Sequence, residues 1–342
     1  MLMPDLLQLC IIPVTALSFG IFFRYFKDTL LDHPNSRSSH SISKSRAGGI
    51  LFGLPWLLVA GMAAILGLPL FQSSAGFDDP TGKSHLLLES GPSSWWFLLG
   101  AFLIWLNGLL DDLHQLPAKY RIVMQALGVA AGILGPEEFR ESLHPLLLLL
   151  VLVGLVYFVN VFNFMDGTDG LAASQGIFLL VGGFLLAYSG LAFQLLAISL
   201  SIFLFWNLPR SRLFMGDSGS NLVGYVTGFL LLKIFLENPA LAFLLPVLFT
   251  ADTTLTLLLR IFRGQMFYQA HREHGYQHLA GKFGHGAVLL IFSILNALVL
   301  AAAFCLERIP GLYQDILLVS VVHILAAVWF YFCGAGRPRT DF

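Results

Sequence analysis

The amino-acid sequence predicts an all-α integral membrane protein, a polytopic bundle of about 10–11 transmembrane helices that forms one domain over residues 1–342. Of its residues, 57% are hydrophobic and 11% are charged, whereas a soluble domain carries about 25% charged residues. Apolar runs of membrane-spanning length recur along the chain, and short polar segments separate them. These observations exclude an ordinary soluble protein.

The expected spans follow from a length of roughly 17–25 mainly apolar residues. They cover residues 6–26, 50–71, 95–110, 122–134, 146–164, 171–188, 191–208, 222–236, 240–262, 287–306 and 312–332. The first span lacks a basic leader and a small-residue cleavage site, so we expect a retained helix and not a signal peptide. The three cysteines lie in apolar segments and predict neither disulfides nor a metal site.

Positive charges are distributed unevenly between the loops. With the N-terminus outside, the odd-numbered loops, their span ends and the C-terminal tail hold most of the 19 Lys and Arg residues. The exceptions are Lys83, Arg140 and Arg308 in even-numbered loops and Lys233 within a span. The positive-inside rule therefore places the odd-numbered loops in the cytoplasm. Because the polar motifs lie in these loops, we expect a site on the cytoplasmic face.

The most informative motif is residues 160–171, Asn-Val-Phe-Asn-Phe-Met-Asp-Gly-Thr-Asp-Gly-Leu, between two apolar runs. Ionisable residues beside a membrane span are costly to bury, so Asp166 and Asp169 favour a functional interpretation. A simpler alternative is that Asp169 caps the next helix and the glycines turn the chain. That alternative leaves Asn163 and Asp166 without a role.

Two further acidic motifs lie at expected helix ends. Asp111 and Asp112 end the third span, where the helix dipole disfavours anions, so a nearby cation is expected: Lys119, Arg121 or a divalent metal. Asp217 lies in Gly-Asp-Ser-Gly-Ser at the start of the eighth span, where free backbone N–H groups favour anions. The alternatives are a solvated helix end for the first motif and a simple N-cap for the second.

Two basic loops complete the pattern. Residues 33–49 contain Arg37, Lys44 and Arg46 before Gly-Gly, which also suits an ordinary basic loop. Residues 260–286 form a long loop with His271, Arg272, His274 and His278. On a helix these histidines would share a face and could bind zinc, but Gly275 and the lack of an acidic ligand favour a lid for phosphates or sugar hydroxyls. Asp252, inside the ninth span, needs a buried partner, for which Arg260 is a distant option.

Carboxylates are hard oxygen ligands that suit Mg²⁺, and Mg²⁺ commonly binds one or two of them together with substrate phosphates. Basic residues around such a site suit the remaining phosphate charge. A site that faces both membrane and cytosol suits one lipid and one soluble substrate. The residues thus predict metal-assisted phosphoryl transfer at a membrane surface.

The motifs, in order, resemble those of the polyprenyl-phosphate N-acetylhexosamine-1-phosphate transferases (glycosyltransferase family 4 type). The resemblance covers almost the whole chain and rests on five segments, which are Arg37 to Gly49, Asp111-Asp112 with Lys119, Asn160 to Leu171, Gly216 to Ser220, and the His-containing loop. It implies transfer of an N-acetylamino-sugar-1-phosphate from a UDP-sugar to undecaprenyl phosphate, with release of UMP. The expected setting is the bacterial inner membrane, in the initiating step of O-antigen (lipopolysaccharide) or other envelope polysaccharide synthesis.

The resemblance also implies residue roles. Asp217 is the expected Mg²⁺ ligand, with Mn²⁺ as an alternative ion, and the expected catalytic residues are Asp111, Asp112 and Asp166. Asp111 is either a base or a phosphate-orienting carboxylate. The expected substrate-binding residues are Arg46, Lys119, Asn163, Asp169, His271, Arg272 and His274.

The last loop departs from the His-rich patterns of the GlcNAc-1-phosphate enzymes and of the peptidoglycan translocase, and Tyr276-Gln277-His278 is more similar to the O-antigen branch. A peptidoglycan-type phospho-MurNAc-pentapeptide transferase is one alternative. A cation-coupled transporter is another, although the polar motifs all lie on one face. A homodimer is left open, and no nucleic-acid partner is expected.

Overall fold

The computed structural model describes residues 3–32, 43–71, 91–266, 271–308 and 311–338. Fourteen helices and one two-stranded ladder occupy these ranges. The elements are α1 (Met3–Tyr25), β1 (Leu31–Asp32), β2 (Lys44–Ser45), α2 (Gly48–Ile65), α3 (Gly91–His114), α4 (Ala118–Leu134), α5 (Glu137–Ser142), α6 (Pro145–Met165), α7 (Leu171–Leu185), α8 (Leu191–Asn207), α9 (Gly216–Glu237), α10 (Pro239–Leu244), α11 (Val247–Phe262), α12 (Gly275–Phe283), α13 (His285–Arg308) and α14 (Leu312–Cys333).

The prediction of an all-α polytopic membrane protein is confirmed. In the described ranges, seven helices are long and apolar enough to cross a membrane, namely α1, α2, α3, α6, α9, α13 and α14. The apolar helices α7 and α8 are shorter, with 15 and 17 residues. The remaining two expected spans, 122–134 and 240–262, correspond to α4 and to α10 with α11.

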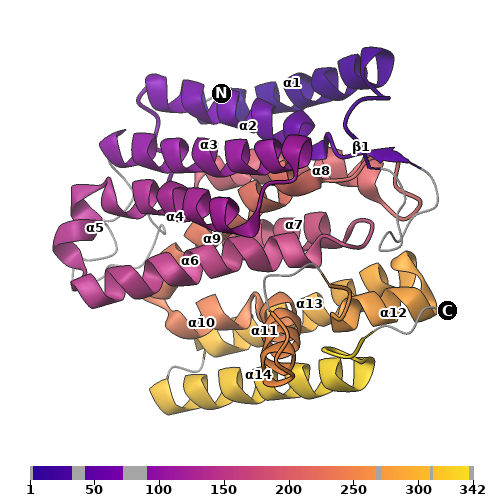
Figure 1. Ribbon diagram of the computed structural model, residues 1–342. Helices are drawn as coiled ribbons and strands as arrows, with labels where there is room; N and C mark the ends of the chain where they lie inside the picture. The colour runs from indigo at the N-terminus through magenta and orange to yellow at the C-terminus, as the bar shows by residue number, and fades with distance from the viewer. Residues whose placement is uncertain (1–2, 33–42, 72–90, 267–270, 309–310, 339–342) are drawn as a thin grey trace.

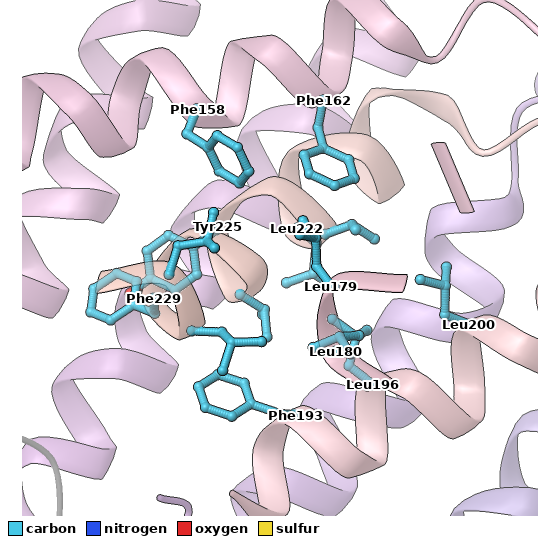
Figure 2. Close-up of a cluster of buried hydrophobic side chains, with 14 of the residues drawn as sticks. Phe158, Phe162, Leu179, Leu180, Phe193, Leu196, Leu200, Leu222, Tyr225 and Phe229 are labelled. Atoms are coloured by element: carbon cyan, nitrogen blue, oxygen red, sulfur yellow. The ribbon is translucent and has the colours of Figure 1, made fainter. Parts of the chain in front are cut away.

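The helix α9 is the centre of the bundle. It packs against α2, α3, α6, α7, α8 and α10, and most of its residues are buried inside the protein. Figure 2 shows part of this core, a cluster of buried side chains that includes Tyr225 and Phe229 of α9, Phe158 of α6 and Phe193 of α8. A helix that is apolar all round must be enclosed by other helices or by lipid. Because its neighbours enclose α9, its polar first turn is held in a fixed position.

The structure corrects two sequence-based expectations. The span expected at 240–262 is divided into α10 and α11, and Pro246 stands at the N-cap of α11. Proline has no N–H to donate and cannot continue a helix without a break. The stretch 260–286, expected to be a loop, contains the end of α11, the whole of α12 and the start of α13. In Figure 1, α11 crosses the direction of the neighbouring helices.

The polar helix ends converge on one end of the bundle. In Figure 1, β1, α12 and the C-terminus lie on the same side. The strand β2 extends this side, because Ser45 pairs with Leu31 and bridges to Leu213, and the Ser45 carbonyl accepts a 2.8 Å hydrogen bond from the N–H of Phe214. The loop before α2 is thus joined to the loop before α9. The predicted motifs of these two loops therefore lie side by side.

Candidate functional site

Four predicted carboxylates, Asp111, Asp112, Asp166 and Asp217, lie where α3 and α6 end and α9 begins. We call them the carboxylate cluster. Asp112 contacts the backbone of Asp217, Asp111 and Asp217 share one cation, and the charges of Asp112 and Asp166 act on each other. Three segments that are far apart in the sequence thus contribute to one acidic site.

Asp112 caps the N-terminus of α9 from another helix. Its Oδ1 accepts the backbone N–H of Asp217 at 2.8 Å, and its Oδ2 accepts the backbone N–H and the Oγ of Ser218 at 3.0 and 2.8 Å. Met215, the N-cap residue of α9, makes no side-chain capping bond. The free N–H groups and the positive dipole of a helix N-terminus favour a carboxylate here. Asp112 therefore fixes the position of Asp217.

Two glycines permit this contact. Gly216 has a φ of +73°, which side chains rarely adopt, and a Cβ at this position would lie 2.8 Å from Asp112 Oδ2. A Cβ on Gly108 would collide with the backbone of Asp217. Glycine thus lets α3 approach α9 closely enough for Asp112 to reach the helix terminus.

Arg121, near the start of α4, contacts both Asp111 of α3 and Asp217 of α9. Its Nη1 lies 2.9 Å from Asp111 Oδ2 and 3.5 Å from Asp217 Oδ2. Asp111 Oδ1 accepts a 2.6 Å hydrogen bond from the N–H of Leu116. Lys119, the predicted contact to the lipid phosphate, is exposed, and its Nζ lies over the Tyr120 ring. The nearby cation expected for Asp111 is therefore Arg121.

Arg46 is the second cation of the cluster. Its guanidinium is half-buried, forms a 2.8 Å ion pair with Asp32, and its charge acts on Asp112, Asp166 and Asp217. The predicted companion Arg37 lies outside the described residues. Lys44 donates a 3.1 Å hydrogen bond to Ser211 Oγ, so it supports the turn before α9.

Asp166 differs from the other acids of the cluster. It ends α6, and the described part of the chain gives its side chain no hydrogen-bond partner. Burial and the charge of Asp112 raise the pKa of the Asp166 carboxyl well above its ordinary value, although Arg46 opposes this. Asn163, one turn earlier, donates a 3.3 Å hydrogen bond to Ser220 Oγ and so ties α6 to α9.

Asp169 is occupied by the protein itself. It accepts hydrogen bonds from the N–H groups of Arg210 and Ser211 at 3.1 and 3.2 Å and from Ser211 Oγ at 2.8 Å. His285 Nδ1 lies 3.3 Å from its Oδ2. Burial raises the pKa of Asp169, but the hydrogen bonds from His285 and Ser211 outweigh it and lower the pKa to about 2. Asp169 holds the 209–212 turn.

The simpler interpretation of Asp169 as a cap of α7 is wrong. The N-cap of α7 is Gly170, with a φ of +77° and no side-chain capping bond of its own. The Gly170 N–H instead donates a 2.9 Å hydrogen bond to Asn207 Oδ1.

The histidine segment, residues 271–274, is fixed by a second buried cap. Asp252 is fully buried in α11, and it accepts the N–H groups of Gly275 and Tyr276 at 2.8 and 2.9 Å. The partner of this buried acid is therefore the N-terminus of α12, while Arg260 pairs with Glu273. The Tyr276 hydroxyl donates a 2.8 Å hydrogen bond to the Phe164 carbonyl. The histidine segment thus lies beside the end of α6, close to Asp166.

His271 and His274 form a ring cluster with Phe164. The two imidazoles are stacked with centroids 4.9 Å apart, and the Phe164 ring lies 6.0 Å from that of His274. Both nitrogens of His271 are buried and have no partner among the described residues. Burial and the charges of His274 and Arg260 lower the pKa of His271 to about 3, so it is neutral at pH 7. Arg272 lies half-buried between them in the sequence.

The residues expected from the sequence to catalyse or to bind substrate do not include Arg121, Ser218, Phe164 or Tyr276. The sequence does indicate Arg121 as one possible countercharge, because it follows the Asp111-Asp112 pair. Ser218 is indicated more weakly, as a neighbour of Asp217. Phe164 and Tyr276 lie within motifs, but their contacts, a ring contact to His274 and a hydrogen bond between Tyr276 and the Phe164 carbonyl, are not indicated by the sequence.

Fold and site together define a polytopic membrane protein with an acidic, oxygen-rich site at one end of its bundle. A family model described as glycosyl transferase family 4 matches residues 94–235, a range that contains the whole carboxylate cluster. The sequence motifs resemble those of the polyprenyl-phosphate N-acetylhexosamine-1-phosphate transferases, and this family model and the relatives named below support that resemblance.

Relatives extend the similarity over most of the chain. A probable undecaprenyl-phosphate N-acetylglucosaminyl 1-phosphate transferase of Bacillus subtilis is 26% identical, over 91% of this chain and 88% of the relative. A decaprenyl-phosphate N-acetylglucosaminephosphotransferase of Mycolicibacterium smegmatis is 27% identical, over 86% of this chain and 80% of the relative. A phospho-N-acetylmuramoyl-pentapeptide-transferase of Deinococcus radiodurans is 30% identical, over 53% of this chain and 58% of the relative.

Proposed function

We propose that this chain transfers an N-acetylamino-sugar-1-phosphate from a UDP-linked donor to undecaprenyl phosphate. In this proposal the reaction takes place on the cytoplasmic face of the bacterial inner membrane and initiates an O-antigen or other envelope polysaccharide. The observation that carries the proposal is the carboxylate cluster with Arg46 and Arg121 at the end of the bundle. The names of the relatives from Bacillus subtilis and Mycolicibacterium smegmatis support the same class of acceptor and sugar.

The donor set of the cluster suits Mg²⁺, with Mn²⁺ as the alternative ion. It consists of carboxylate oxygens, and the Asp217 side chain is 27% exposed and thus within reach of a ligand. Among the described residues, no three acidic, His or Cys side chains surround one point. Mg²⁺ commonly takes one or two carboxylates and completes its shell with phosphates and water. When bound by Asp217, the ion would offset the pyrophosphate charge and polarise the reacting phosphate.

The other three acidic residues of the cluster have different proposed roles. Asp112 holds the first turn of α9 in place, and Asp111, with both oxygens engaged, orients Arg121. Asp166, whose pKa is raised, is the proposed base. A phosphate monoester has a second pKa of about 6, so Asp166 is needed only for the fraction of the acceptor that is still protonated.

The polar groups around the cluster are proposed to bind the two substrates. Arg46 faces the cluster and contributes positive charge to the pyrophosphate. Lys119 is exposed at the start of α4, where a lipid phosphate could reach it. His271, which is neutral, and His274 are the proposed neighbours of the sugar, and Arg272 offers charge beside them. Asn163 lies on α6 one turn before Asp166, and Asp169 contributes by holding the turn before α9.

The test is transfer of a radiolabelled sugar phosphate by purified protein with undecaprenyl phosphate, Mg²⁺ and a panel of UDP-amino sugars. Label should enter the lipid with one donor, disappear with EDTA, and fall by a factor of at least about 100 in Asp217→Asn. Glu137→Gln, an exposed residue paired with Arg140 on α5, is the matched control and should retain wild-type transfer.

The Deinococcus radiodurans relative, a phospho-N-acetylmuramoyl-pentapeptide-transferase, supports a second candidate function, the peptidoglycan-type reaction. The donor panel should therefore include UDP-MurNAc-pentapeptide. Label transferred from that donor alone would assign the peptidoglycan-type reaction. If folded protein transfers label from no donor, the transferase proposal fails, and a cation-coupled transporter becomes the better hypothesis.

A further inference from the structure

A single nitrogen of Arg121 lies between two acids that come from different helices. Nη1 contacts Oδ2 of Asp111 at 2.9 Å and Oδ2 of Asp217 at 3.5 Å. Guanidinium–carboxylate pairs are frequently bidentate, but here one N–H-bearing atom serves two carboxylates. Two facing carboxylates repel each other, and a cation between them offsets this repulsion. Arg121 supplies that cation between Asp111 and Asp217.

A divalent ion held by Asp217 would take over part of this task. We infer that Arg121 is the internal counter-cation of the metal site. On arrival of the metal and the donor it is displaced from Asp217, and its guanidinium is released to the donor phosphates. The inference rests on the proposed function, in which Asp217 is a metal ligand.

The contact of Arg121 with Asp111 is shorter and more buried than its contact with Asp217, as expected if Arg121 stays bound to Asp111 and leaves Asp217. The shorter contact is to Asp111, whose side chain is only 9% exposed and is also held by Leu116. The longer contact is to Asp217, and both that side chain and Arg121 are about three times as exposed, at 27% and 31%. Arg121 can therefore remain anchored to Asp111 while it leaves Asp217. A guanidinium has further N–H groups in a planar fork, which fits phosphate oxygens.

The distinguishing measurement is Mn²⁺ binding to detergent-solubilised protein without donor or lipid, followed by electron paramagnetic resonance. Arg121→Gln removes the competing cation and should tighten Mn²⁺ binding roughly fivefold, a size set by the partial exposure of the pair. A variant with a damaged fold would bind Mn²⁺ more weakly, so tighter binding by Arg121→Gln cannot be caused by misfolding. Arg121→Lys should restore wild-type affinity, because it returns the charge.

Lys119→Gln is the matched control for Mn²⁺ binding, because it removes a cation two residues away that lies over the Tyr120 ring. It should leave Mn²⁺ affinity unchanged, and an equal gain in this variant would overturn the inference by showing a long-range charge effect. In the transfer assay, Arg121→Gln should raise KM for the UDP-sugar, because the phosphates lose a partner.

Wild-type and Arg121→Gln proteins that bind Mn²⁺ equally well, or more weakly in the variant, would overturn the inference. If wild-type protein still transfers the sugar phosphate in that case, only the inference fails and the proposed function stands. Absence of transfer by wild-type protein, together with Mn²⁺ binding that is retained in Asp217→Asn, would instead count against the proposed function and its metal ligand.

Discussion

The carboxylate of Asp112 and residue Ser218 are joined by two hydrogen bonds, one to the backbone N–H at 3.0 Å and one to the hydroxyl at 2.8 Å. This pair links the last turn of α3 to the first turn of α9 across 106 residues of sequence. A helix ordinarily receives its cap from the residue just before it. Here an acid of a neighbouring helix replaces that residue, so the geometry of the site depends on the packing of α3 against α9.

We therefore predict that Asp112→Asn destabilises the protein by about 2 kcal/mol. The side-chain NH₂ of asparagine would replace one of the two oxygens that accept hydrogen bonds from α9, and an NH₂ group cannot accept them. Thermal unfolding in detergent measures the change. Ser218→Ala, which removes only the hydroxyl bond, should cost less. An Asp112→Asn protein as stable as wild type would contradict the capping role and leave Asp112 free to act on substrate.

The second cap gives a parallel prediction for α12. Asp252 is fully buried, and its two oxygens accept the N–H groups of Gly275 and Tyr276. Asp252→Asn should lower the thermal midpoint by several degrees, at a cost of about 2–4 kcal/mol, because a buried N–H loses its acceptor. Transfer should fall as well, since Tyr276 ties α12 to the end of α6.

Thr256→Ala is the control for Asp252→Asn, because it removes only the 3.2 Å bond from the hydroxyl to Asp252. A midpoint for Asp252→Asn within one degree or so of that control would show that α12 does not depend on this cap.

The spans and the clustering of acids could be predicted from the sequence because both follow from local patterns. Apolar runs of sufficient length indicate membrane helices, and loop charges indicate which helix ends share a face. The partners of each acid could not be predicted in this way. Lys119 and Arg121 are two residues apart on α4 and so point about 200° away from each other, and only the packing of α4 against α3 selects Arg121.

The two helix caps and the break in the ninth span also were not predicted from local sequence patterns. Asp112 and Asp252 cap helices that begin far along the chain, and no spacing rule connects them to Ser218 or Gly275. The break between α10 and α11 had a local signal in Pro246, but the length of the apolar run favoured one span. Long-range contacts therefore decide how each acid of the site is used.

The hydrogen bonds of Asp169 predict a pH dependence of stability. Its pKa is about 2 in the folded chain and about 3.9 in an unfolded one. A lowered pKa means that the carboxylate stabilises the fold above the unfolded value, and that this contribution is lost as the pH falls from about 4 towards 2. Asp169→Asn should thus be less stable than wild type by about 2 kcal/mol at pH 7.

Thermal unfolding of wild-type and Asp169→Asn proteins measures this difference. The difference between their melting midpoints should be smaller near pH 3 than at pH 7. Ser211→Ala removes the 2.8 Å bond to Oδ1 and should reproduce part of the loss at pH 7. A gap of the same size at both pH values would show that the carboxylate charge of Asp169 is not what holds the 209–212 turn.

His271 leads to a prediction about catalysis. Burial and the charges of His274 and Arg260 lower its pKa to about 3, so the ring stays neutral between pH 5.5 and 8. A neutral ring can donate or accept a hydrogen bond but adds no positive charge for phosphates. His271→Gln should therefore lower the transfer rate, through loss of the ring, without changing the shape of the pH–rate profile. Profiles of kcat/KM for both proteins test this, because kcat/KM reports the groups of the free enzyme. If wild-type protein shows a limb near pH 6.5 that is absent in His271→Gln, then His271 titrates in the working range and binds substrate as a cation.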